Sequence, residues 1–283
     1  MKSIALLSNK KKELLLGTIF LTVNVVFYIF SADNATFIEG ADAGQYYDPA
    51  ISLLQDGGLT AGPGVEFSTM GTPLYSILLA IPIGIFGIDH SSLAIVFIQC
   101  FLLYLTGIIT RKFSIVFLKK ESFLLHSLII FNPNSLITAH LVQTETLFTL
   151  FLVLSVYYLF KLLDKNSFKY VFLLSVSLGL LTLTRPAGLY LIYFVPVLLL
   201  GFVYINNRTK IKNYAIKVFL LVLLSLSMIS PWVIRNYLVF DEVFVSSNAG
   251  PYLKDQYIQL LKIGRQWNEK QAIDYINILQ KNY

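Results

Sequence analysis

The stretch LAIVFIQCFLLYLTGIITRKF, residues 93–113, decides the fold of this chain. It holds no charged residue before Arg111, and it is as long as the roughly 20 residues that an α-helix needs to cross a bilayer. The single cysteine, Cys100, lies inside it and is interpreted as a small buried apolar residue. The sequence therefore offers neither an intrachain disulfide nor a cysteine metal site.

The composition of the whole chain agrees with this segment. Hydrophobic residues make up 56% of the 283 residues and charged residues 13%, whereas a soluble domain usually carries about 25% charge. The mean hydropathy is +0.68. We therefore expect an all-α, polytopic membrane protein. The net charge is +6. We attribute this excess of basic residues to cytoplasmic loops rather than to a nucleic-acid-binding surface.

Eight apolar runs are candidates for membrane spans. The first could be a signal peptide, but an uncleaved anchor is favoured because its core is long and Tyr28–Ala32 is a poor cleavage site. The second is short and contains Pro82 and Gly84, which favours an interfacial or re-entrant helix. The runs are Leu14–Phe30, Pro73–Phe86, Leu93–Phe113, Phe123–Ala139, Thr146–Leu163, Tyr170–Thr184, Leu189–Ile205 and Tyr214–Ile229.

The distribution of basic residues selects seven spans. If Pro73–Phe86 does not span and the N-terminus is cytoplasmic, most of the 22 lysines and arginines lie inside, as the positive-inside rule requires. They form four clusters, at Lys2–Lys12, Arg111–Lys120, Lys161–Lys169 and Arg208–Lys217.

This topology predicts two segments outside the membrane. The first outer loop, residues 31–92, contains acidic residues but no lysine or arginine, and we expect it to be ordered, with juxtamembrane helices. The predicted domains are a transmembrane module at residues 1–231 and an extracytoplasmic segment at residues 232–283. The latter is expected to form amphipathic helices within Tyr252–Tyr283.

Four ionisable residues are predicted at the outer face. They are Asp42, Glu145, Arg185 and Arg235, and ionisable groups near the membrane plane are costly unless paired or functional. A carboxylate there could deprotonate an attacking hydroxyl, and arginines could bind a phosphate. The alternative is that all four are loop charges that mark the ends of spans.

The remaining residues are candidates for contact with a substrate or a metal ion. Tyr46 and Tyr47 could stack on a sugar ring or simply pack the loop, and Asn236, beside Arg235, is a candidate substrate contact. Asp42, Asp48 and Glu145 could hold a divalent metal, although nothing in the sequence requires one, and we assign no metal ligand. No phosphate-binding loop, HExxH or GxSxG motif is present.

Several motifs, in order along the chain, resemble those of the GT-C class of membrane glycosyltransferases. The chain is similar to bacterial protein mannosyltransferases and lipid A aminoarabinose transferases, of the glycosyltransferase family 39 type. The matching segments are Asp42–Ala50, Gly71–Tyr75, Thr144–Phe148, Gly179–Pro186, Pro231–Tyr237 and Val245–Gly250.

The resemblance implies an enzyme of a bacterial plasma membrane that acts on the extracytoplasmic face. It implies a polyprenyl-phosphate sugar donor, inversion at the anomeric carbon, a juxtamembrane helix after Gly71–Pro73 and Asp42 as the catalytic base. Arg185 and Arg235 would then face the donor phosphate, and Glu145 would contact sugar or acceptor. The acceptor could be a lipid, a glycan or a protein.

Two departures keep other functions open. Many relatives have a second acid after the first aspartate, where this chain has Ala43, and many continue into further spans, so the chain could be the shared module or a truncated product. One alternative is a non-catalytic protein that keeps the scaffold and binds a lipid-linked glycan. A secondary transporter would need inverted repeats, which we do not find.

Overall fold

The regular elements of the structure are helices, which confirms the predicted all-α membrane fold. The computed structural model describes residues 8–31, 43–64, 71–206, 208–246, 262 and 270–271. Its elements are α2 (Asn9–Ser31), α3 (Gly44–Gln55), α4 (Leu74–Phe86), α5 (Ser92–Phe117), α6 (Phe123–Ile130), α7 (Pro133–Ala139), α8 (Glu145–Lys165), α9 (Phe168–Thr184), α10 (Gly188–Asn206), the short 3-10 helix η2 (Arg208–Lys210) and α11 (Ile211–Phe240).

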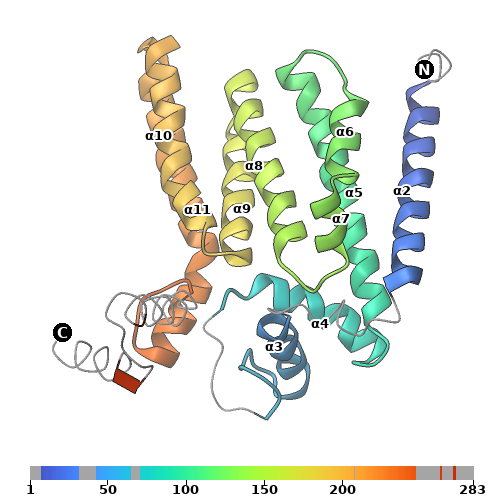
Figure 1. The fold of residues 1–283 in the computed structure, drawn as a ribbon. Coiled ribbons are helices and arrows are strands. Elements are labelled where there is room, and N and C mark those ends of the chain that lie inside the picture. Colours follow the sequence, from blue (N-terminus) through green and yellow to red (C-terminus); the bar gives the residue numbers. More distant parts are fainter. Residues whose placement is uncertain are drawn as a thin grey trace.

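Five helices among the described residues are long and apolar enough to cross a membrane. They are α2, α5, α8, α10 and α11, the last counted with η2. Helix α9 is apolar but has 17 residues, and it packs between α8 and α11. Together with the α6–α7 segment, these helices occupy the positions of the seven predicted spans (Figure 1).

One predicted span is two short helices. The run Phe123–Ala139 is interrupted after Ile130, and α7 begins at Pro133. Proline disfavours the helical conformation in the residue before it, and Asn132 is extended there while its side chain accepts a hydrogen bond from the Ser135 amide. Since Pro133 also suits the first position of a helix, a new helix starts at the break.

The two ends of the helix bundle differ in charge. One end of the bundle holds the start of α2 and the α5–α6, α8–α9 and α10–α11 connections (Figure 1). These segments carry the described residues of the four predicted basic clusters. Helices α3 and α4 lie across the opposite end, as predicted for the first outer loop. Which end faces the cytoplasm stays a prediction from the positive-inside rule.

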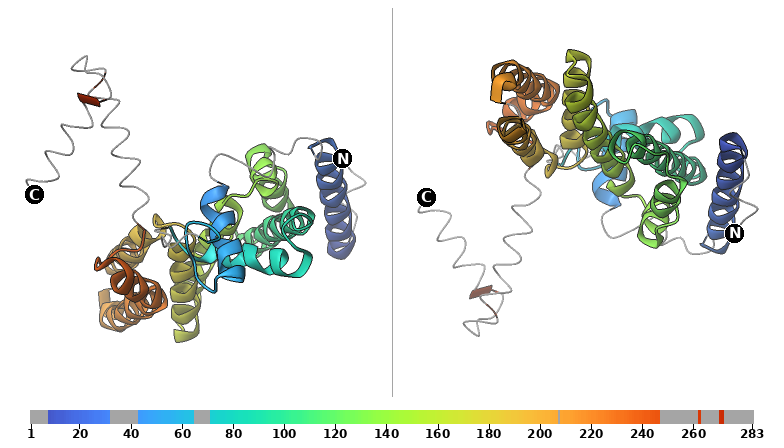
Figure 2. Two further views of the ribbon diagram at one scale, coloured as in Figure 1. Left: turned by 90° about the horizontal axis from the view of Figure 1, so that it is seen from below. Right: turned by 90° about the horizontal axis from the view of Figure 1, so that it is seen from above.

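Three apolar clusters hold the helices together. The largest joins α8, α9, α10 and α11 through buried residues such as Leu174, Leu181 and Leu221. A second packs α3 and α4 onto α5 and the start of α8, and a third packs α2 onto α5, α6 and α7. Helix α2 and the α10–α11 pair lie at opposite edges of the bundle (Figure 2).

The predicted C-terminal segment falls largely outside the description. Helix α11 continues through Pro231 to Phe240, so residue 231, the proposed end of the transmembrane module, lies within a helix. Apart from residues 262, 270 and 271, the amphipathic helices predicted for residues 252–283 lie outside the described residues.

Gly179 sets how closely α9 approaches α11. A Cβ atom at Gly179 would lie 2.6 Å from Cβ of Met228, and small residues are what allow such close packing between membrane helices. We expect Gly179→Ala to destabilise the protein by about 1–3 kcal/mol through overpacking, measured by thermal unfolding in detergent. Gly201→Ala is the matched control, since a Cβ there meets nothing within 4 Å. Equal melting temperatures for the two variants would contradict this packing.

Candidate functional site

The candidate site residues that the structure describes lie at the end of the bundle that carries α3 and α4. Tyr46 and Tyr47 belong to α3, Glu145 begins α8, and Arg185 directly follows α9. Arg235 and Asn236 lie near the end of α11. Asp42, the predicted base, lies outside the described residues and directly precedes the first of them in this loop, Ala43.

An ion pair joins Glu145 to Arg185. Nη1 of Arg185 donates to Oε1 of Glu145 at 2.8 Å, and the two side chains are 40% and 34% exposed. Glu145 lies in the first turn of α8 and Arg185 caps the end of α9, so each charge also has the sign that its helix terminus favours. With this exposure the pair adds little to stability, but it fixes the direction of both side chains.

The Gly71–Tyr75 motif is bonded to the end of α9, next to Arg185. The hydroxyl of Thr72, which is buried, donates to the backbone carbonyl of Thr184 at 2.8 Å. Thr184 is the residue before Arg185, so this bond ties the start of α4 to the end of α9. Two motifs that are more than 100 residues apart in the sequence therefore meet in space.

A buried polar network connects α4, α5 and the segment before α8. The Tyr75 hydroxyl donates to Oε1 of Gln99 at 2.7 Å, and Nε2 of Gln99 donates to the carbonyls of Leu141 at 2.9 Å and Ala139 at 3.2 Å. Burial raises the pKa of Tyr75 far above its ordinary value, and the nearby carboxylate of Glu145 acts in the same direction. The phenol is thus placed as a hydrogen-bond donor to Gln99 in a buried site.

Tyr46 joins the same group of residues. Its ring packs edge-on against the ring of Tyr75, with 5.4 Å between the centroids. Tyr46 and Tyr75 pack in one apolar cluster with Leu147, two residues after Glu145, so the structure brings both tyrosines close to the start of α8.

The hydroxyl of Tyr47 forms hydrogen bonds with the connection between α4 and α5. Its hydroxyl is 3.0 Å from Oγ of Ser91 and donates to the carbonyl of Ile88 at 3.2 Å. These bonds tie α3 to the connection between α4 and α5. Of the two interpretations that the sequence left open for Tyr47, loop packing is therefore the one that the contacts favour.

Arg235 and Asn236 form a second group. The guanidinium of Arg235 lies 4.5 Å from the Trp232 ring, and it donates to Oδ1 of Asn236 at 2.8 Å and to the carbonyl of Leu59 at 3.0 Å. Asn236, fully buried, donates in turn to the carbonyl of Phe244 at 3.0 Å. Arg235 thus holds the loop that follows α3 against the end of α11.

The two groups share one segment of the first outer loop. Tyr46, near the start of α3, belongs to the first group, and Leu59, after α3, contacts the second. In the described part of the chain no hydrogen bond joins Arg235 to Glu145 or Arg185. The two groups thus meet different parts of the same loop.

The described residues contain no set of three or more histidine, cysteine, aspartate or glutamate side chains placed to hold a metal ion. Asp42, one of the three residues considered for a divalent metal, lies outside the described residues.

Two residues at the candidate site, Tyr75 and Gln99, were not among the candidates predicted from the sequence. Tyr75 is in one of the motifs, and Gln99 stands as an amide within an otherwise apolar run. An amide in the middle of a predicted span needs a hydrogen-bond partner, because the bilayer provides none. That requirement could have marked Gln99, but only the packing of α4 on α5 identifies Tyr75 as its partner.

The Gln99 network should contribute measurably to stability. Gln99→Leu leaves the Tyr75 hydroxyl and two carbonyls without this partner, and we expect a loss of about 1–3 kcal/mol, measured as thermal unfolding in detergent. Gln55→Leu, at an exposed position of α3, is the matched control. If Tyr75→Phe and Gln99→Leu were fully additive in the double variant, the two side chains would not be coupled.

Comparison with known proteins finds a match to a protein family. A family model described as dolichyl-phosphate-mannose-protein mannosyltransferase matches residues 70–234. This range covers more than half of the chain, from the Gly71–Tyr75 motif to the residue before Arg235. No curated protein and no solved structure gives a significant match.

Proposed function

The chain belongs to the dolichyl-phosphate-mannose-protein mannosyltransferase family, and on that premise we propose that it transfers a sugar from a polyprenyl-phosphate donor to an acceptor hydroxyl. Family membership makes it a membrane glycosyltransferase, and its apolar helices make it an integral membrane protein. The proposal concerns the donor, the residues that act and the face of the membrane. The observation that carries it is the ion pair of Glu145 and Arg185.

Arg185 is suited to bind the donor phosphate. Among the described residues Glu145 is its hydrogen-bond acceptor, bonded through Nη1, and 40% of the side chain is exposed. A guanidinium has five N–H donors in a fixed fork that matches a phosphate. Because Glu145 already holds the side chain in place, little further rotamer entropy is lost when the phosphate binds.

Arg235 is proposed as a second phosphate contact with a positioning role. Its bonds to Leu59 and Asn236 hold the loop after α3, and the same segment begins next to Asp42. A variant at Arg235 is therefore expected to affect loop position and donor binding together, which makes Arg185 the cleaner probe of the phosphate.

Asp42 is proposed as the general base. Its carboxylate takes the proton of the acceptor hydroxyl while that oxygen attacks the anomeric carbon. The bond between the anomeric carbon and the phosphate oxygen breaks, and polyprenyl phosphate leaves with the electron pair, stabilised by Arg185. The position of the neighbouring Ala43 supports this role, since Ala43 is buried in the cluster that contains Tyr75 and Leu147, beside the start of α8.

The extracytoplasmic face is proposed from charge. The end with α3, Glu145 and Arg185 is opposite the end that carries the basic clusters, and basic clusters are retained in the cytoplasm. Donor phosphate and acceptor would then meet at the outer surface of the membrane, where a lipid-linked donor presents its sugar to water.

Asp42→Asn tests the base. We expect the rate constant kcat to fall by about 10²–10⁴-fold, the usual contribution of a general base, in a transfer assay with purified protein and a polyprenyl-phosphate sugar. Asp89→Asn, at an exposed position of the same outer loop, should keep the wild-type rate. Full activity of Asp42→Asn at equal membrane expression would rule out this assignment. Donor binding without turnover by the wild-type chain would favour the non-catalytic scaffold.

Arg185→Gln tests the phosphate contact. Loss of one charge-assisted hydrogen bond costs about 1.5–3 kcal/mol, so we expect kcat/KM for the donor to fall roughly 10- to 100-fold. Arg208→Gln, at the opposite end of the bundle where Arg208 stacks on Tyr204, is the control. If a second change, Glu145→Gln, restored the activity of Arg185→Gln, Arg185 would serve only to neutralise Glu145.

A further inference from the structure

Helix α2 leaves a groove on one side of its contact with α5. The groove has a volume of about 650 Å³. Its lining is mainly apolar, with polar side chains near one end. The residues that line it are Lys10, Glu13, Leu14, Gly17, Thr18, Phe20, Leu21, Asn24, Phe97, Cys100, Phe101 and Tyr104.

The walls of the groove face the hydrocarbon of the bilayer. Leu14, Leu21, Phe97 and Phe101 are between 57% and 72% exposed, and both helices are candidate membrane spans. In the membrane such a groove is filled by a hydrocarbon chain, because water would find too few polar partners there.

The floor of the groove has its polar groups satisfied internally. The Cys100 thiol donates to Oδ1 of Asn24 at 3.2 Å, and Nδ2 of Asn24 donates to the carbonyl of Phe20 at 2.8 Å. A Cβ atom at Gly17 would lie 3.0 Å from the Tyr104 hydroxyl, so the glycine lets Tyr104 lie directly against α2. The floor is therefore closed and offers an occupant mainly carbon.

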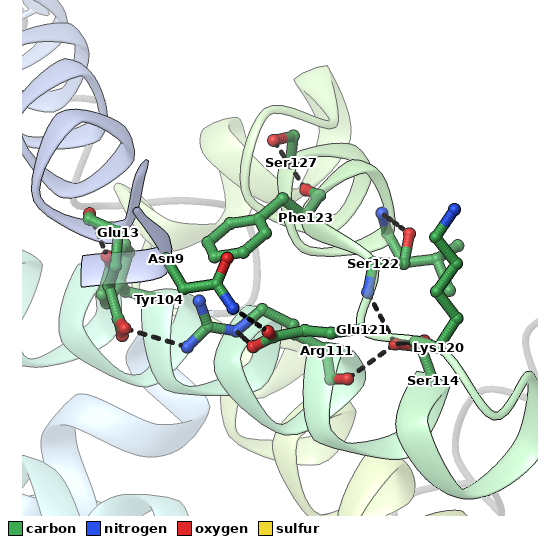
Figure 3. A network of polar contacts seen from close by, with 11 residues as sticks. Asn9, Glu13, Tyr104, Arg111, Ser114, Lys120, Glu121, Ser122, Phe123 and Ser127 are labelled. Atoms are coloured by element: carbon green, nitrogen blue, oxygen red, sulfur yellow. Dashed lines mark hydrogen bonds and ion pairs between the residues drawn. The ribbon is translucent and has the colours of Figure 1, made fainter. Parts of the chain in front are cut away.

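One end of the groove is basic. Glu13 is paired with Arg111 at 3.0 Å, and Arg111 also contacts Glu121 at 3.5 Å (Figure 3). Asn9 donates to the same Glu121 at 2.6 Å. Both acids next to this end are thus engaged in ion pairs or hydrogen bonds. Lys10 lines the groove, and Lys11 and Lys12 follow it at the start of α2, with the Lys12 ammonium 5.9 Å from the Phe123 ring. The mouth of the groove carries an excess of positive charge.

The length of the groove matches one leaflet. From Lys10 to Asn24 an α-helix rises about 21 Å at 1.5 Å per residue. Half of a bilayer with its headgroup region is about 20–22 Å thick. An acyl chain in the groove would therefore start at the bilayer centre near Asn24 and bring its headgroup to the level of Lys10–Lys12.

We propose that the groove between α2 and α5 binds an acyl chain of an anionic phospholipid, whose headgroup phosphate is bound by Lys10, the lysine that lines the groove, while Lys11 and Lys12 add positive charge at the same level of the helix. The lipid belongs to the leaflet at the basic end of the bundle. This site is separate from the proposed donor site, because Arg185 caps the end of α9, which lies at the opposite end of the bundle from the start of α2. The lipid would also support α2, which lies at the edge of the bundle and is tied to it by the Glu13–Arg111 pair and by packing on α5, α6 and α7.

Thr18→Trp tests the groove. The full chain is purified in mild detergent, incubated with phosphatidylglycerol or phosphatidylcholine, and bound lipid is counted by native mass spectrometry. Thr18 lines the groove, so the indole should displace the lipid. Thr22→Trp is the matched control: Thr22 is on the same helix, outside the lining, and both hydroxyls donate at 2.9 Å to the carbonyl four residues earlier. Equal lipid occupancy in the two variants would overturn the proposal.

The charge of the lipid is tested separately. The wild-type chain should retain phosphatidylglycerol several-fold more tightly than phosphatidylcholine, and replacing Lys10, Lys11 and Lys12 by Gln should remove that preference. Replacing Lys161, Lys165 and Lys169 by Gln alters the same number of charges at the same end, and it should leave the preference intact. Equal retention of both lipids by the wild type would also overturn the proposal. Transfer activity is not measured here, so this result and the test of Asp42 are independent.

Discussion

The hydrocarbon of a bilayer provides no hydrogen-bond partner for a backbone amide or carbonyl, and the rest of this structure depends on that constraint. It explains why the apolar runs are helices and why irregular segments collect at the two ends. The one break within a predicted span, between α6 and α7, occurs at Asn132–Pro133, where the Asn132 side chain caps the new helix. Internal amides obey the same rule, as Gln99 shows by bonding to Tyr75 and to two carbonyls.

At each end of the bundle an arginine is paired with glutamate, but the two arginines differ in their exposure. At the basic end Arg111 is shielded by Glu13, Glu121 and the Phe123 ring, which leaves a structural junction between α2, α5 and α6. At the other end Glu145 and Arg185 are paired yet partly exposed. An exposed, oriented cation can still bind a ligand, whereas a buried and shielded one cannot. This contrast is why we place the chemistry beside Arg185 rather than beside Arg111.

The first outer loop connects the parts of the candidate site. Its helix α3 presents Tyr46 to Tyr75, and its later turn gives the Leu59 carbonyl to Arg235. The predicted grouping of Glu145 and Arg185 at one end is matched by a direct bond. Arg185 and Arg235, both predicted to face the donor phosphate, share no hydrogen bond among the described residues. The hydroxyl of Tyr47, a candidate for sugar stacking or loop packing, ties α3 to Ser91.

By itself the sequence determined the fold class, the approximate spans, the separation of basic and acidic segments and the family resemblance. Each of these depends on local composition or on short motifs, and bilayer thickness converts composition directly into helices. Only the tertiary structure decided which polar groups meet: Tyr75 with Gln99, Thr72 with Thr184, Arg235 with Leu59. Those pairs depend on how helices are rotated and how closely they pack, as at Gly179 and Met228. No local pattern encodes a rotation that arises from contacts between segments far apart in the chain.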